Sequence, residues 1–194
     1  MRLYEDTLIE WLKVFVHSDV HPSGARRKRP SAPPVSEEEM RQAEAALGFT
    51  LPPLLRRLYL EVSNGDFGPG LLRLNDDPSS HRQSYPPSLV SWYVEYRSAT
   101  QQYLDEWWGD EEEDRPMVCP EKLMKIADWG CNIYSCLDCT KEACPVLRND
   151  NNISFRTFAI EAPSLHQWLE DWLDGKQLFW LDWDTAEKIT FPLG

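Results

Sequence analysis

The sequence lacks the features that would place the chain in a membrane or send it across one. No stretch reaches the roughly 18 consecutive apolar residues that a membrane-spanning helix needs. The N-terminal stretch MRLYEDTLIEWLKVF mixes acidic with apolar side chains. It therefore lacks the basic start and the unbroken apolar run of a secretory signal. We expect a cytoplasmic protein without membrane association.

Basic residues are also scarce in this chain. Its 20 Lys and Arg face 32 Asp and Glu, which gives a formal net charge of -12. A charge of this sign repels the phosphates of nucleic acids and anionic membrane surfaces, so we expect no direct nucleic-acid binding and a cationic partner instead. The basic run Arg26-Arg27-Lys28-Arg29 lies among prolines and is typical of a solvated loop, with a nuclear-import or nucleic-acid signal as the alternative.

The cysteines do not form a disulfide framework. Their number, five, is odd, and without a secretory signal this favours reduced thiols. Cys131, Cys136, Cys139 and Cys144 suggest a four-thiolate zinc site. However, Cys136 and Cys139 would lie about 10 Å apart on opposite faces of a strand, and no glycine supports a tight metal-binding turn. We expect no metal and no cofactor, and small buried thiols instead.

Signatures of catalysis are missing as well. The glycines between Gly65 and Gly70 lack the lysine and the following helix of a phosphate-binding loop. The four histidines are scattered, so no local pattern supplies a base for a cysteine nucleophile. Asp128 and Asp138 flank a predicted strand, where carboxylates usually cap turns. We therefore predict no catalytic residue, and a thiol or zinc hydrolase ranks third among the interpretations.

What the sequence does contain is enough apolar material for a folded domain. Of its 194 residues, 42% are hydrophobic, which predicts one domain with a sizeable core. Apolar residues recur at helical spacing over residues 3–17, and we expect this whole stripe to be buried. It consists of Leu8, Trp11, Leu12, Phe15 and Val16.

Local signals mark the remaining helices. Ser36 and Glu39 form a capping box that begins a helix, and Gly48 is suited to ending it. Pro53 suits the first position of the next helix, which Asn64-Gly65 should stop. Apolar spacing predicts one long helix or two consecutive helices over residues 89–108 and another helix over residues 165–173.

Strand formers and turn residues alternate in the second half of the chain. We expect strands near residues 71–74, 123–127, 132–139, 145–148 and 155–160, a bend at residues 128–130, a turn at residues 149–152 and a short element at residues 178–183. The predicted fold class is α+β: one domain with a curved, mostly antiparallel sheet and the N-terminal and C-terminal helices packed around it.

Residues 105–114, DEWWGDEEED, combine seven carboxylates and two tryptophans without a basic residue. Such a run is commonly a solvated loop. It is also suited to partner binding, because clustered carboxylates attract a basic partner and exposed tryptophans anchor it. The candidate partner-binding residues are Asp105, Glu106, Trp107, Trp108, Asp110, Glu111, Glu112, Glu113 and Asp114.

Three stretches together resemble the SUKH superfamily, which includes yeast cell-wall-assembly regulators and many bacterial toxin-immunity proteins. They are LGFTLPPLLRRLY at residues 47–59 with Ser63-Asn64-Gly65, ADWGCNIYSCLDC at residues 127–139 with PVLRNDNN at residues 145–152, and APSLHQWLEDWLDG at residues 162–175. The resemblance implies a family core at residues 36–175, preceded by a helix and basic loop at residues 3–35 and followed by a tail at residues 176–194. The motif residues in its central strands are Trp129, Gly130, Cys131, Tyr134, Cys136, Asp138 and Cys139.

The resemblance implies a non-catalytic immunity protein that binds and neutralises a cognate polymorphic toxin. A nuclease toxin suits the acidic charge, because nuclease clefts are commonly basic and a carboxylate-rich surface competes with nucleic acid for them. The alternative is a regulatory scaffold that binds a signalling or cell-wall-synthesis protein, as the fungal members suggest.

Overall fold

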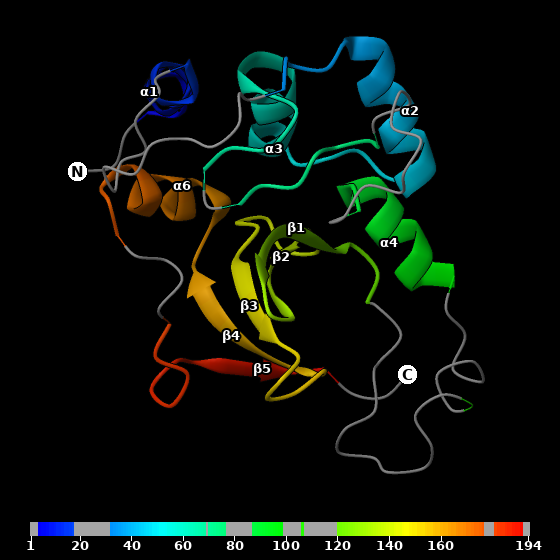
Figure 1. Ribbon diagram of the computed structural model, residues 1–194, viewed down its shortest axis with the longest axis vertical. Helices are drawn as coiled ribbons and strands as arrows, with labels where there is room; N and C mark the ends of the chain where they lie inside the picture. Colours follow the sequence, from blue (N-terminus) through cyan, green and yellow to red (C-terminus); the bar gives the residue numbers. More distant parts are fainter. Residues whose placement is uncertain are drawn as a thin grey trace.

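The computed structural model describes residues 4–17, 32–68, 70–76, 87–98, 106, 120–176 and 181–191. These residues form an α+β fold in which helices lie above and beside a five-stranded antiparallel sheet (Figure 1). The predicted fold class is thereby confirmed. The helices are α1 (Glu5–His17), α2 (Glu37–Leu47), α3 (Pro53–Arg57), the π-helical turn η1 (Leu58–Val62), α4 (Leu89–Ser98) and α6 (Leu165–Leu173). No described helix is long and apolar enough to cross a membrane.

Local hydrogen bonds explain where α2 begins and ends. The backbone N–H of Glu39 donates to Ser36 Oγ at 3.2 Å, and the backbone N–H of Ser36 donates to Glu39 Oε2 at 2.8 Å. This confirms the predicted capping box, which satisfies two backbone N–H groups at once. Gly48 ends the helix at a φ of 79° and donates its N–H to Glu44 O, so its left-handed conformation is required.

The sheet is an antiparallel meander in the order β1-β2-β3-β4-β5. Cys131 and Asn132 join β1 to β2 and have φ values of 52° and 62°, as the two-residue hairpin turns that match strand twist require. The bend predicted at residues 128–130 is therefore wrong, because β1 continues through it. The strands are β1 (Leu123–Gly130), β2 (Ile133–Asp138), β3 (Val146–Asp150), β4 (Thr157–Ala162) and β5 (Lys188–Thr190).

The strand predicted at residues 71–74 is also wrong, because this segment makes only one isolated bridge to β1. Its backbone groups bond to several separate partners instead: the N–H of Leu72 donates to Ile126 O, and Arg73 O and Leu74 O accept from the N–H groups of Leu89 and Val90. Tyr59 Oη donates to Leu72 O at 2.9 Å, and the backbone N–H of Leu74 donates to Asn64 Oδ1 at 2.8 Å. Since these partners already satisfy the segment, no ladder of strand bonds is needed.

At its C-terminal end the described chain has a strand that the sequence did not predict. β5 pairs with β4, with Phe158 opposite Ile189. We expected a terminal element at residues 178–183, but residues 177–180 lie outside the described residues and residues 181–183 form neither helix nor strand. The predicted helix over residues 89–108 is seen as α4 only to Ser98, and among residues 99–108 only Glu106 is described.

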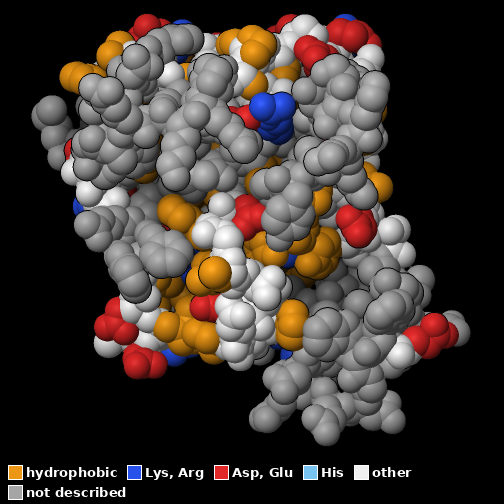
Figure 2. All heavy atoms as spheres, in the orientation of Figure 1, with side chains coloured by type: hydrophobic (Ala, Val, Ile, Leu, Met, Phe, Trp, Pro, Cys, Tyr) orange, Lys and Arg blue, Asp and Glu red, His pale blue; other side chains and the backbone are white. Residues whose placement is uncertain are grey.

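The core lies on both faces of the sheet. One cluster contains Leu8, Leu55, Ile126, Leu137 and Trp168 and joins α1, α3 and α6 to the sheet. A second, smaller cluster on the other face contains Leu123, Tyr134, Cys136, Leu147 and Phe158. Figure 2 shows hydrophobic side chains gathered over the middle and lower part of one side of the molecule, where Figure 1 places the strands.

Candidate interaction surface

A buried polar network lies between the sheet and α6, centred on Glu161. Its carboxylate accepts from Arg148 twice, from Nη2 at 2.7 Å and from Nε at 3.2 Å. Ser135 Oγ donates to it at 2.6 Å and Trp168 Nε1 at 2.8 Å. The side chains of Arg148 and Glu161 are 3% and 2% exposed. A carboxylate offers about four acceptor positions, so the network uses all of them and leaves none for a substrate.

Bulges in the sheet direct the side chains of Glu161 and Trp129 into this network. Val146 pairs with Ala162 and Leu147 with Ile160, which leaves Glu161 as the extra residue of β4. Trp129 is likewise an extra residue of β1, a position from which a bulge redirects a side chain. The same indole packs on Arg148, with Cζ 4.7 Å from the ring centroid, and donates to Ser135 Oγ at 2.7 Å. The motif residue Trp129 is therefore partly buried and packs against the core.

Tyr134, another motif residue, helps to surround Lys125 on the opposite side of the sheet. The ammonium of Lys125 lies 3.7 Å from the ring centroid of Tyr134, 3.8 Å from that of Trp92 and 4.2 Å from that of Tyr96. It also donates to Tyr96 Oη at 2.8 Å. Trp92 and Tyr96 come from α4, so these cation–π contacts fix α4 against β1.

The other motif residues lie at the end of β1, in the turn before β2, along β2 and just beyond it. Cys136 is buried, Cys139 and Cys144 are partly exposed and Cys131 is exposed, so among the described cysteines the expectation of a buried thiol is confirmed only for Cys136. Asp138 caps the turn that follows β2, because its Oδ1 accepts from the backbone N–H of Thr140 at 3.0 Å. Asp128 acts in the same way, accepting from the backbone N–H of Gly130 at 2.7 Å.

Cys139 and Cys144 lie at the two ends of the β2–β3 connection and interact with each other. The hydrogen bond from the Cys139 thiol lowers the pKa of Cys144 below its usual value. The same hydrogen bond, followed by burial, raises the pKa of Cys139. Among the described residues, no group of three or more metal-ligating side chains forms a metal site. The two thiols thus form an interacting pair without a third ligand from the described part of the chain.

The histidine of the closing helix, His166, lies in a largely buried position. Its side chain is only 12% exposed, and its Nε2 lies 3.5 Å from Glu170 Oε1 on the same helix. Its neighbour Leu165 is buried, as the apolar spacing of α6 requires. The partner of His166 is thus a carboxylate rather than a thiol.

The predicted acidic surface at residues 105–114 is represented only by Glu106, which is exposed. The other nine residues of this segment lie outside the described residues. Its role in partner binding therefore stays a prediction.

A second exposed surface, which the sequence did not predict, lies on α1. Trp11 and Val14 are 50% and 63% exposed, and Tyr4, just before the helix, is 86% exposed. The buried side of α1 consists of Leu8, Ile9, Leu12 and Val16. The prediction that Trp11 belongs to the core is therefore wrong. Helical spacing places it at the edge of the apolar stripe, and there the packing of neighbouring elements decides its exposure.

One protein-family model matches most of the chain. Residues 34–172 match the model of the SMI1/KNR4 family (SUKH-1). The chain belongs to the SMI1/KNR4 (SUKH-1) family. A search of curated proteins found no match.

The SUKH-1 match covers α2 to α6, including the Glu161 network and the Lys125 contacts. α1 lies before the matched residues, so its exposed stripe is carried by a segment outside the family model. Members of this family are commonly immunity proteins. The matched core thus contains the motif residues, while the exposed apolar side chains of α1 lie beside it.

Proposed function

We propose that this SUKH-1 chain is a non-catalytic immunity protein that binds and neutralises a cognate polymorphic toxin in the cytoplasm of the cell that makes it. The observation that carries the proposal is the family match over residues 34–172. The net charge of -12 supports a basic toxin, and a nuclease is the toxin class that such a charge suits best.

The proposed mechanism is competition by a bound protein rather than chemistry. An acidic surface is drawn to the basic cleft of a nuclease, and long-range attraction accelerates their encounter. Once bound, the immunity protein occupies the cleft where nucleic acid phosphates would lie. Raising the salt concentration screens this attraction and should slow association.

Purification of the tagged full-length chain from its own cells, with any protein bound to it, tests this proposal. The bound protein is identified, produced separately and assayed for cleavage of plasmid DNA and of RNA. We expect the chain to suppress this activity at about one equivalent and to protect cells that express the toxin.

Two outcomes would contradict the proposal. A bound protein that is harmless to cells lacking the chain would favour a regulatory scaffold. Full nuclease activity at saturating amounts of the chain would exclude neutralisation. Glu111→Lys, Glu112→Lys and Glu113→Lys together address the acidic segment, and unchanged toxin binding by this variant would show that another surface binds the toxin.

A further inference from the structure

The exposed stripe of α1 has the spacing of a single helix face. Tyr4, Thr7, Trp11 and Val14 follow one another at steps of three and four residues, which places them on one side of the helix. Elsewhere in the described chain, the large hydrophobic side chains that are exposed are those of Val94 and Ile153. Three of the five exposed large hydrophobic residues thus gather on the α1 stripe.

Packing holds the central side chain of this stripe in place. The Trp11 ring stacks on Phe15 at a centroid distance of 6.3 Å, and Phe15 contacts Trp172 of α6 edge-on at 6.1 Å. In Figure 1, α1 lies directly beside α6. The contact with Phe15 restricts the Trp11 ring on one side, and a side chain restricted before binding loses less conformational entropy when it binds a partner.

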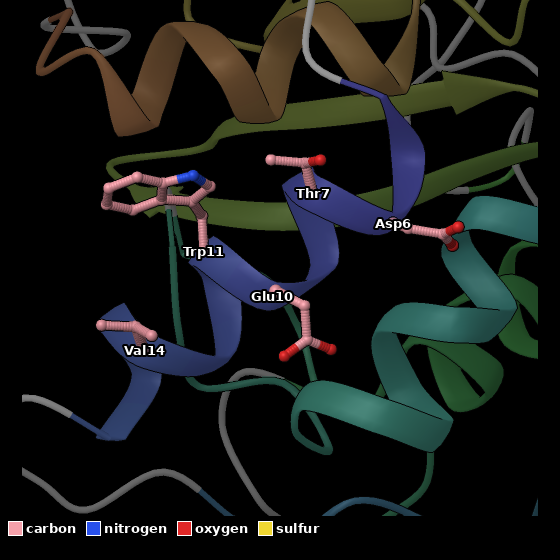
Figure 3. A pocket seen from close by; sticks show the side chains of 5 residues that line it. All are labelled: Asp6, Thr7, Glu10, Trp11 and Val14. Atoms are coloured by element: carbon pink, nitrogen blue, oxygen red, sulfur yellow. The ribbon is translucent and has the colours of Figure 1, made fainter.

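A shallow groove of about 420 Å³ runs along the stripe. Asp6, Thr7, Glu10, Trp11 and Val14 line it, and Figure 3 shows Trp11 and Val14 projecting on one side of α1 while Asp6 and Glu10 project on other sides. We call these five residues together with Tyr4 the α1 face. Its apolar side chains are therefore bordered by carboxylates.

The carboxylates keep a local negative charge at the α1 face. Asp6 contacts Arg57 and Glu10 contacts Lys13, but the side chains of Asp6 and Glu10 remain 89% and 70% exposed. The ion-pair cluster to which they belong contains four acids and two bases: Glu5, Asp6, Glu10 and Glu61 with Lys13 and Arg57. This excess of negative charge favours a cationic partner. It disfavours a second copy of the chain, because the carboxylates of the two copies would repel each other.

We propose that the α1 face is a docking surface for a basic protein segment. This segment inserts an apolar side chain beside Trp11 and Val14 and places Lys or Arg side chains near Asp6 and Glu10. This inference rests on the proposed function, because the basic partner is the toxin. It identifies the α1 face as the surface that contacts the toxin.

The first test uses a defined probe, a fluorescein-labelled amphipathic peptide of Leu and Lys residues, with the full-length chain. We expect one peptide to bind per chain, and Trp11→Ala with Val14→Ala to weaken binding by roughly 10- to 30-fold. The matched control is Val94→Ala with Ile153→Ala, which removes apolar side chains of similar exposure away from the α1 face. This control should bind like wild type.

Thermal unfolding of both variants shows whether each is folded. Glu10→Gln provides a second variant, which keeps the apolar stripe and removes one carboxylate of the α1 face. Equal loss of peptide affinity in the test and control variants would overturn the inference. Wild-type affinity of Trp11→Ala with Val14→Ala would overturn it too. A wild-type dimer that this variant dissociates, measured by light scattering, would identify a second copy as the occupant and would also overturn it.

The second test repeats the substitutions with the toxin that the chain neutralises. Neutralisation that survives Trp11→Ala with Val14→Ala unchanged would leave the proposed function standing and refute the α1 face as the toxin contact. If wild type neutralises no bound protein, the proposed function fails. The peptide measurement still reports separately whether the α1 face binds basic amphipathic segments.

Discussion

Two arginines of this protein each bind carboxylates, but in opposite surroundings. Arg148 meets Glu161 under α6, where both side chains are almost completely buried. Arg57 meets Glu5, Asp6 and Glu61 where α1 packs on η1, and all four side chains are at least partly exposed. Burial therefore decides how much an arginine–carboxylate pair matters for stability. Removing one partner of a buried pair is costly because the other charge stays buried, whereas solvent and salt weaken an exposed pair.

The Arg148 region maintains the fold, whereas the Arg57 region lies beside the α1 face that we propose to bind a partner. The Arg148 network lies within the residues that match SUKH-1, and all acceptor positions of its carboxylate are used. The Arg57 cluster instead attaches α1, which lies outside the matched residues. Substitutions in the two regions should consequently affect different measurements.

The largest effect is expected for Arg148→Ala. This change leaves Glu161 buried without its cation, which typically destabilises a protein by about 3–5 kcal/mol. Urea unfolding measures the loss. Arg148→Met with Glu161→Leu should recover only part of it, because this change removes the buried charges but leaves Ser135 Oγ and Trp168 Nε1 without their acceptor. A loss below about 1 kcal/mol for Arg148→Ala would show that the network does not stabilise the core.

A smaller loss is expected for Tyr59→Phe. The Tyr59 hydroxyl donates to Leu72 O, and its removal leaves a buried carbonyl without this partner, at a cost of about 1–3 kcal/mol. Tyr4→Phe is the control, since Tyr4 is almost fully exposed. Equal stability of Tyr59→Phe and Tyr4→Phe in urea unfolding would contradict the role of this bond in holding residues 71–74.

Ser36→Ala should cost about 1 kcal/mol at neutral pH, because it removes the cap of α2. Hydrogen bonds from the Ser36 backbone N–H and hydroxyl lower the pKa of Glu39. The stabilisation from a lowered carboxyl pKa is complete above the pKa of the unfolded chain and is lost as pH falls through the folded value. The difference in unfolding free energy between wild type and Ser36→Ala should therefore become smaller as the pH falls into the acid range.

Ser164→Ala is the matched control for this pH dependence. Ser164 caps α6 by accepting from the backbone N–H of Gln167 at 3.1 Å, and Gln167 carries no charge. The loss of stability in Ser164→Ala should be similar in size to that in Ser36→Ala and nearly constant between about pH 7 and pH 3. Equal pH dependence for the two variants would contradict the part assigned to Glu39.

The smallest effect is expected for Arg57→Ala. Exposed ion pairs contribute about 0.2–1 kcal/mol each, and salt reduces this further. We expect a loss of stability below about 1 kcal/mol that diminishes at high ionic strength, measured by urea unfolding at two salt concentrations. A loss as large as that of Arg148→Ala would remove the distinction between the two arginines.

The sequence predicted features that depend on neighbouring residues. The capping box at Ser36, the end of α2 at Gly48 and the apolar side of α6 follow from spacing and backbone chemistry, and all are confirmed. The central strands were predicted as well, although their ends shifted. The turn after β1 uses Cys131 and Asn132 in left-handed conformations that their side chains do not signal.

Features that depend on distant residues could not be predicted. Arg148 and Glu161 meet through a bulge between β3 and β4, and nothing in the sequence marks that bulge. Residues 71–74 form no strand because their backbone bonds to several segments, among them the side chains of Tyr59 and Asn64 and the first residues of α4. The exposure of Trp11 depends on how α1 packs against η1 and α6. Each case is decided by tertiary contacts rather than local preference.

Hydrogen–deuterium exchange of the full-length chain, with and without the toxin it neutralises, tests the central claim most directly. We expect binding to protect backbone amides of residues 5–17, with little change in the strands around Glu161. The same experiment with Trp11→Ala should show this protection only at higher toxin concentration. Protection confined to residues 34–172, with α1 unchanged, would contradict the assignment of toxin contact to the α1 face.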